Sequence, residues 1–332
     1  MAALTTTQAT LLDWAKLRDP DGSLAKIVEI LNQNNQILAD MMWIEGNGPT
    51  GHRTTIRTGL PTPTWRLLNN GVQPSTGTTA QIDEQCGMLV AWNVVDETLA
   101  NLGGNPAGVR SSLARAHLEG MAQEFAATIF YGAASAPEEF VGLAVRYNDS
   151  TAGNGDNLIL GGGTGSTDNT SIWLISHDEE TFCGIFPQGA QAGLRHQDLG
   201  VETVEAAGGT AGALMRAYRD YFEWQGGIAL KDWRYAVRIA NLDVSQLEAD
   251  SGAPDLLRLM ADAEERIPND LGTRAFYMNR TVRRNLRHQT TAAVSTGGGI
   301  TFENVGGKRV MMFGTTPVHI CDALLNTEDV VA

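Results

Sequence analysis

The chain is poor in lysine, cysteine and long apolar runs, and each shortage excludes a class of protein. Only four of its 332 residues are lysine. The three cysteines, Cys86, Cys183 and Cys321, are widely separated and show no CxxC pairing, so neither a disulfide framework nor a zinc site is predicted. We expect them to be buried thiols.

Membrane and export signals are also missing from the sequence. No run approaches the roughly 18 to 20 apolar residues that a membrane-spanning helix needs. The first residues lack the charged start and apolar segment of a signal peptide. We therefore expect a soluble chain that is not exported by that route.

The charge balance is strongly acidic, with a formal net charge of −14. Nucleic-acid-binding surfaces need clustered Lys and Arg, so direct DNA binding is not predicted. A hydrophobic content of 42% with 19% charged residues is typical of a globular protein. At 332 residues the chain exceeds the size of a single growing core, which favours two lobes.

One segment runs against this balance. Residues 46–82 contain no Asp or Glu but carry Arg53, Arg57 and Arg66. A strand around Thr54–Ile56 and a return strand from Ile82 to Val94 predict a long β-hairpin with an irregular, proline-rich tip. Because an isolated hairpin is marginal in water, we expect this positive arm to lie on another copy of the acidic chain. A basic solvent loop without a partner is the alternative.

Local signals predict several helices. Asn105-Pro106 is a preferred helix start, and apolar positions including Leu118, Met121 and Phe125 continue it to Gly132, about 26 residues or about 40 Å. Three further helices are expected on helical spacing of apolar residues: 24–31, 212–224 and 253–267. A basic helix is expected over 281–289, capped by Asn279.

The expected strands follow a glycine-rich bridge, residues 151–157, which is a plausible lobe boundary. Ser171–Ser176 predicts a strand around Trp173. From Lys231 to Ala240, Trp233 alternates with polar residues including Arg238, the pattern of a half-buried strand. Short strands are also expected over 274–278, 308–313 and 317–321.

The residues that could form a chemical site do not have the spacing that a known catalytic or binding motif requires. The run GGGTGS from Gly161 lacks the lysine of a phosphate loop and precedes a strand, so a turn is favoured. Ser176, His177 and Asp178 are adjacent and point to alternate strand faces, which argues against a triad. Arg195, His196 and Asp198 are interpreted as a hydrogen-bonded structural network. The acids between Glu248 and Asp270 fit a solvated helix face. No catalytic, cofactor-binding or metal residue is predicted.

Four motifs, in order along more than half of the chain, resemble the major capsid proteins of tailed, podovirus-type bacteriophages. They are GGGTGSTDNTSIWLISHD, GIFPQGAQAGLRHQDLG, DWRYAVRIANLD and AFYMNRTVRRNL. The resemblance implies an α+β, HK97-like fold and a non-enzymatic subunit of an icosahedral virion shell. The subunit would assemble in the bacterial cytoplasm into hexamers and pentamers around DNA. Further implied partners are a cementing or decoration protein, a scaffolding protein and a portal.

The resemblance also divides the chain. It implies an N-terminal arm (1–45), an extended loop (46–95), a peripheral P-domain with the spine helix at about 106–131 (96–144), an axial A-domain (145–300) and a C-terminal return to the P-domain (301–332). Two sets of residues follow as hypotheses. Subunit contacts are Arg53, Arg57, Arg66 and Trp65; structural anchors are Leu118, Met121, Phe125, Trp173, Arg195, His196, Asp198, Trp224 and Trp233. An encapsulin-like nanocompartment shell and a soluble oligomeric enzyme stay open as alternatives.

Overall fold

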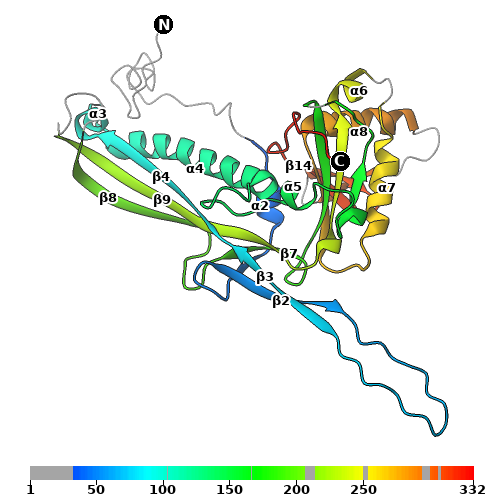
Figure 1. The fold of residues 1–332 in the computed structure, drawn as a ribbon. Helices are drawn as coiled ribbons and strands as arrows, with labels where there is room; N and C mark the ends of the chain where they lie inside the picture. The colour runs from blue at the N-terminus through cyan, green and yellow to red at the C-terminus, as the bar shows by residue number, and fades with distance from the viewer. Residues whose placement is uncertain are drawn as a thin grey trace. The chain divides into compact units, whose positions relative to one another are not determined.

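The computed structural model describes residues 33–102, 104–165, 167–205, 214–249, 253–293, 300–305 and 308–332. The chain divides into two compact units (Figure 1). Unit 1 contains residues 1–33, 88–125 and 193–225, and unit 2 contains residues 34–87, 126–192 and 226–332. The helix predicted over 24–31 lies outside the described residues.

Unit 1 is built on three strands: β4 (Gly87–Asp96), β8 (Leu194–Glu205) and the first part of β9 (Leu214–Leu230). β8 and β9 pair antiparallel from Leu194 opposite Trp224 to Glu205 opposite Leu214. β4 is the next strand after β9 in the sheet order. It leads into α3 (Glu97–Asn101), where the Asp96 carboxylate accepts hydrogen bonds from the first free backbone N–H groups.

The spine helix α4 spans Pro106–Tyr131, the predicted bounds. The Asn105 side chain accepts a hydrogen bond from the Gly108 N–H at 3.0 Å, which confirms the predicted cap. Within unit 1 the helix packs on the strands at two points. Val109 joins a small core with Val95, and the Phe125 ring stacks on Trp224 with centroids 4.4 Å apart.

The core of unit 2 is a mixed sheet in which β6 (Asn169–His177) is central. β6 is antiparallel to β10 (Ala236–Asp243) on one side and to β11 (Thr273–Met278) on the other. The strands that extend this sheet are β5 (Leu158–Leu160), β14 (Thr316–Ile320), β13 (Lys308–Phe313) and β12 (Ile300–Val305), with β7 (Phe182–Phe186) and β1 (Trp43–Glu45) following β6.

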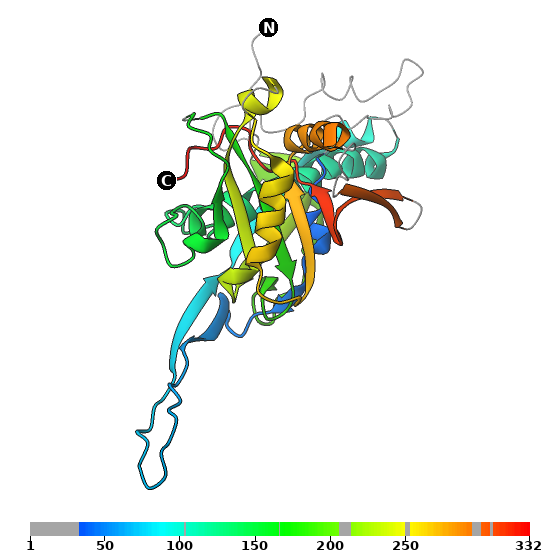
Figure 2. The same ribbon diagram turned by 90° about the vertical axis from the view of Figure 1, so that its right-hand side faces the viewer.

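Two helices pack on this sheet, α7 (Leu256–Arg266) and α8 (Arg280–Ala293), which are yellow and orange in Figure 2. Met260 of α7 and Leu286 of α8 are fully buried in one apolar cluster with strand residues such as Leu174. The Asn279 side chain accepts from the Val282 N–H, as predicted for the start of α8. The shorter helices of the unit are α2 (Ile37–Asp40), α5 (Leu143–Arg146) and α6 (Val244–Ala249).

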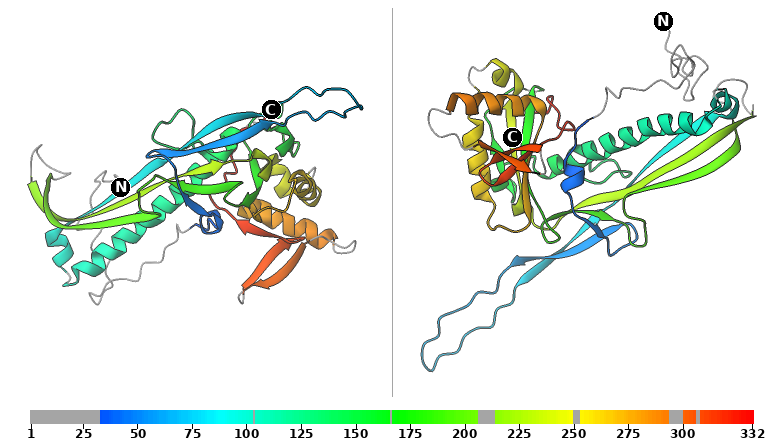
Figure 3. Two further views of the ribbon diagram at one scale, coloured as in Figure 1. Left: turned by 90° about the horizontal axis from the view of Figure 1, so that it is seen from below. Right: turned by 180° about the vertical axis from the view of Figure 1, so that it is seen from behind.

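A hairpin of β2 (Gly51–Gly59) and β3 (Thr78–Gln85) also belongs to unit 2. It is the blue-to-cyan segment in both views of Figure 3. The strands pair antiparallel from Gly51 opposite Gln85 to Gly59 opposite Thr78. The predicted hairpin is therefore confirmed.

Three predicted elements are wrong in type or extent. The helix predicted over 212–224 is wrong, because its described residues, 214–224, belong to strand β9. Apolar spacing of three and four residues suggested a helix. The run is rich in Tyr, Phe and Trp, which favour strands, and its described residues pair with β8 along their length. The single return strand from Ile82 to Val94 is two strands, because β3 ends at Gln85 and β4 begins at Gly87.

The half-buried strand predicted over 231–240 is the third correction. Trp233–Tyr235 form a short 3-10 turn, and β10 starts at Ala236. All eight residues of β10 are buried, including Arg238. One face of β10 packs in the apolar cluster with α7, and on the other Arg238 donates to the Tyr147 carbonyl and to Glu328, so this polar residue does not mark a solvent side.

The two compact units group the chain by packing, and the expected domain boundaries stay a prediction. Residues 193–225, expected in the A-domain, group with most of the spine helix in unit 1. The C-terminal strands β13 and β14, expected to return to the P-domain, pair with each other and with β11 in unit 2. Both groupings arise from long-range strand pairing, which local sequence patterns do not encode.

Candidate assembly site

The loop between β2 and β3 gathers exposed large apolar side chains within a short stretch of unit 2. Trp65 is 101% exposed and Leu68 is 92% exposed. The other apolar side chains of this tip are Leu60, Leu67 and Val72. Contiguous apolar side chains left in water are typical of a surface that binds another protein.

The four predicted subunit-contact residues all lie on the hairpin, but they are not equivalent. Arg53 is paired within the chain, since its Nε and Nη2 donate to the two carboxylate oxygens of Asp83 at 2.5 and 2.8 Å. Asp83 lies directly opposite Arg53 in the register and just outside the acid-free segment. Arg57 is exposed on β2, and Arg66 Nε donates to the Asn70 carbonyl at 2.8 Å within the tip.

The base of the hairpin is fixed by a bidentate ion pair. Arg146 of α5 donates to both carboxylate oxygens of Glu84 at 2.5 and 2.7 Å. Glu84 is 7% exposed, so the pair is shielded from water. Arg146 also donates to the Val141 carbonyl. This arrangement holds the end of β3 against α5.

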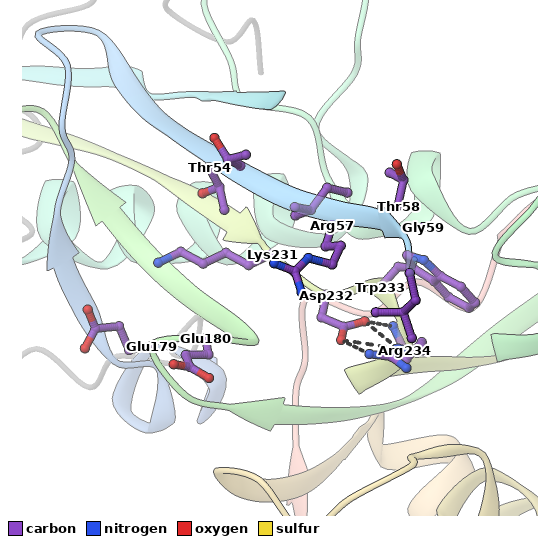
Figure 4. Close-up of a pocket in the computed structure, with 13 residues that line it drawn as sticks. Thr54, Arg57, Thr58, Gly59, Glu179, Glu180, Lys231, Asp232, Trp233 and Arg234 are labelled. Atoms are coloured by element: carbon purple, nitrogen blue, oxygen red, sulfur yellow. Dashed lines mark hydrogen bonds and ion pairs between the residues drawn. The ribbon is translucent and has the colours of Figure 1, made fainter. Parts of the chain in front are cut away.

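A cavity of about 1020 Å³ lies beside the hairpin (Figure 4). Residues 54–59 of β2 and the following Leu60 line one side, and the opposite side is formed by Glu179, Glu180 and residues 231–234. Asp232 and Arg234 are paired at 2.6 Å, and this hydrogen bond raises the pKa of the Arg234 guanidinium. The cavity is lined by charges of both signs, which suits a polar protein segment.

The structural anchors of unit 1 fall into two groups. Met121 and Phe125 are buried, whereas Leu118 and Trp224 are half-buried. Arg195, His196 and Asp198 are exposed residues of β8. They do not form one network: Arg195 lies 3.5 Å from Glu223, and the other two face a different ion pair. Neighbouring residues of a strand point to opposite faces, which accounts for the split.

The ion pairs of Arg110 with Asp198 and Asp220 were not predicted from the sequence. Arg110 of α4 lies 2.6 Å from both Asp198 and Asp220, and Asp220 of β9 is only 4% exposed. Hydrogen bonds from Arg110 and from the Gly200 N–H lower the pKa of the Asp198 carboxyl. His196 Nε2 lies 3.4 Å from Asp220. The available signal was the pair of acids, Asp220 and Glu223, within the aromatic run from Tyr218 to Trp224.

In unit 2 the two tryptophan anchors differ in exposure. Trp173 is fully buried, with Tyr147 edge-on at 5.8 Å and the Arg238 guanidinium 5.4 Å from its ring centroid. Trp233 is 37% exposed and lines the cavity beside the hairpin. Its carbonyl accepts a hydrogen bond from the Tyr147 hydroxyl at 2.5 Å.

Two of the chemical sites considered in the sequence lie on and beside the strand β6. Gly161 to Gly165 follow β5 in irregular backbone, and the next element is the strand β6, as predicted. His177 is buried against Tyr277, with Nε2 2.7 Å from the hydroxyl. In the described part of the chain, no group of three or more His, Cys, Asp or Glu residues is placed to hold a metal ion. No described helix is long and apolar enough to cross a membrane.

Comparison with known proteins places these features in one family. The family model described as major capsid protein GP7 matches residues 19–332. A chain in the near-atomic structure of bacteriophage epsilon15 is 32% identical, with a TM-score of 0.78, over 100% of this chain and 99% of its own length.

More distant likenesses are found among other shells. The capsid of bacteriophage JBD30 is 10% identical, with a TM-score of 0.49, over 97% of this chain and 96% of its own. An encapsulin of Synechococcus elongatus is 10% identical, with a TM-score of 0.43, over 72% and 98%. No curated protein matches the chain. On the family model and the epsilon15 likeness, the chain belongs to the major capsid protein GP7 family of bacteriophages.

Proposed function

We propose that this capsid subunit forms hexamers and pentamers in which the β2–β3 tip of each copy packs on a neighbouring copy. The observation that carries the proposal is the full exposure of Trp65 together with four further apolar residues of the tip. Covering them would remove apolar surface from water and stabilise the contact by roughly 25 cal/mol per Å² of apolar area buried. A shell protein has a second copy of itself available at every such tip.

The charges of the tip support the same partner. Arg57 and Arg66 lie in a segment without acids, whereas the whole chain has a net charge of −14. A positive arm is attracted to an acidic second copy and guided into register by it. Arg53 is not proposed as a contact to the second copy, because Asp83 of its own hairpin already binds it.

We propose the following division of roles for the chain. Residues 1–45 act as an arm, 46–95 as the extended loop, 96–144 as the P-domain, 145–300 as the A-domain that surrounds the hexamer and pentamer axes, and 301–332 as a return segment. The support is the family membership, together with the spine helix α4 and the hairpin at the expected positions.

The proposed shell encloses double-stranded DNA without reading its sequence. Assembly takes place in the host cytoplasm, with a scaffolding protein, a portal and a cementing or decoration protein as partners. The subunit acts structurally and not as an enzyme. The 32% identity to a chain of the epsilon15 structure favours this phage role over a nanocompartment shell.

The test replaces the apolar tip and follows assembly. Trp65→Ser combined with Leu68→Ser is expected to leave the subunit folded and to abolish closed shells in sedimentation velocity and negative-stain images. Leu214→Ser, which removes a 71% exposed leucine from β9, is the matched control. Normal shells from the double variant would overturn the proposed role of the tip.

The charge contribution is tested separately. Arg57→Glu with Arg66→Glu is expected to slow assembly more at low salt than at high salt, because screening weakens contacts between exposed charges. Arg53→Glu is excluded, since it would face Asp83 and disturb the hairpin itself. An assembly rate equal to that of the wild type at all salt concentrations would rule out these two arginines as contacts.

A further inference from the structure

One face of helix α8 is a stripe of cationic side chains. It consists of Arg280, Arg283, Arg284, Arg287 and His288, the i, i+3, i+4, i+7, i+8 spacing of a single helix face. The opposite face is apolar, with Val282 and Leu286 fully buried. Residues 271–302 contain no Asp or Glu, although the chain as a whole is strongly acidic.

These five side chains and Ile320 of β14 line a cavity of about 470 Å³. Two carboxylates from outside α8 bind arginines of the stripe. Asp322 accepts two hydrogen bonds from Arg280, both at 2.8 Å, and Glu248 of α6 accepts one from Arg284 at 2.9 Å. Each of these carboxylates therefore engages one arginine of the stripe.

Arg283 occupies the middle of the stripe and differs from Arg280 and Arg284. Its Nε is buried and meets no hydrogen-bond acceptor among the described residues. Burial, followed by the charges of Arg287 and Arg280, lowers the pKa of the Arg283 guanidinium. A half-buried cation among like charges is costly unless an anion joins it.

We propose that the α8 face and Ile320 form a phosphate-binding pocket, with the backbone of the enclosed DNA as the source of the phosphate. The planar guanidinium fork matches phosphate oxygens in a bidentate manner. A tetrahedral phosphate offers more acceptor oxygens than a carboxylate. It can therefore bind Arg283 and a neighbour while Asp322 and Glu248 keep their own arginines.

The pocket qualifies the conclusion drawn from overall charge. A net charge of −14 argues against a broad DNA-binding surface, yet it does not prevent one local site where positive charge gathers. Contacts to phosphate oxygens carry no sequence information, so such a site holds any DNA. Phosphate binding itself is independent of the assembly proposed above, and only the choice of DNA as the source depends on it.

The first experiment titrates the full-length chain with inorganic phosphate by calorimetry, at ionic strength held constant with chloride. Saturable binding is expected for the wild type. Arg283→Gln should weaken it about tenfold, the effect of losing a charge-assisted hydrogen bond. Arg258→Gln, which removes an exposed arginine of α7 outside the pocket, should leave it unchanged. Arg283→Lys keeps the charge but loses the fork, and should also bind less tightly.

The second experiment adds a short DNA duplex. Competition between duplex and phosphate is expected, and Arg283→Gln should reduce the salt dependence of duplex affinity by about one unit of slope. Phosphate binding without competition by the duplex would overturn DNA as the source. If Arg283→Gln does not fold, titration of the wild type still shows whether the subunit binds phosphate, and Arg283→Lys tests the role of the guanidinium.

Two other results have distinct meanings. Absence of phosphate binding to the wild type would overturn the pocket. If folded Arg283→Gln then also failed to assemble, the α8 face would instead be a contact for carboxylates of a second copy. Phosphate binding that survives in tip variants unable to assemble would support the pocket and leave the assembly proposal to be judged separately.

Discussion

Arg238 and Glu328 form a buried ion pair across ninety residues of sequence. Arg238 Nη2 lies 2.9 Å from Glu328 Oε2, and each side chain is only 4% exposed. Tyr131 and Ser171 donate their hydroxyl protons to the same carboxylate, and Arg238 Nη1 donates to the Tyr147 carbonyl at 2.8 Å. The pair ties the C-terminal segment to β6, to β10 and to the end of α4.

Breaking this pair from one side should strongly destabilise the subunit. Arg238→Met leaves the Glu328 carboxylate buried without its cation, and we expect a loss of about 3 to 5 kcal/mol in the free energy of unfolding. The measurement is urea denaturation of dissociated subunits. Glu248→Gln, which removes a 54% exposed carboxylate paired with Arg284, should cost less than about 1 kcal/mol. Equal effects of the two changes would contradict the account.

Local signals were enough to predict parts of this fold. The Asn105-Pro106 start of α4, the Asn279 cap of α8 and the turn-rich β2–β3 hairpin each depend on residues close together in sequence. The sheet of unit 2 was harder. The alternating pattern placed Arg238 on the solvent side of a strand, but distant residues, Tyr147 and Glu328, cover it and make it a core residue.

The candidate site shows the same limit. The excess of arginine between residues 46 and 82 predicted a positive arm, but the pairing of Arg53 with Asp83 depends on hairpin register. The basic helix around Arg283 was also predicted. That its arginines line a cavity with Ile320 follows from the strand β14, thirty-seven positions further along the chain, which pairs with β11. Cavities of this kind are a property of tertiary packing.

Acid should destabilise the subunit through His177. The Tyr277 hydroxyl donates to Asp40 at 2.9 Å, so it accepts from His177 Nε2, and Nδ1 is buried without a partner among the described residues. Burial is the main cause that lowers the pKa of His177 from 6.5 to about 4. The unfolded state thus binds more protons between these two pH values, and stability falls as pH falls through that range.

The measurement is the free energy of unfolding of dissociated subunits between about pH 7 and pH 4. His177 alone should contribute a loss of roughly 3 kcal/mol over this range. His177→Gln cannot take up this proton, so its stability should depend less steeply on pH. Parallel pH profiles of the two proteins would show that His177 is not the titrating group.

The cysteines should react slowly while the subunit is folded. Burial raises the pKa of Cys183 to about 11 and is the main cause that raises the pKa of Cys321 to about 12. Because the thiolate is the nucleophile, few reactive sulfur atoms are present near neutral pH. Labelling with a thiol reagent should become fast only after denaturation in urea, when all three cysteines should react. Fast labelling of either residue in the folded subunit would contradict its burial.

The end of α4 should depend on glycine at position 132. A Cβ built there would lie 2.1 Å from the Phe140 carbonyl oxygen and 2.8 Å from that of Thr128, and both are backbone atoms. The Gly132 carbonyl also accepts from the Gly142 N–H at 2.9 Å, so neither segment can move freely. Gly132→Ala should therefore cost about 1 to 3 kcal/mol of stability, the usual effect of overpacking.

Gly153→Ala is the matched control, because a Cβ at that turn meets nothing within 4 Å. This change should be neutral or slightly stabilising, since alanine reduces the freedom of the unfolded chain. Urea denaturation of both variants alongside the wild type gives the comparison. The same stability change in both would mean that the close approach of α4 to residues 140–142 does not constrain position 132.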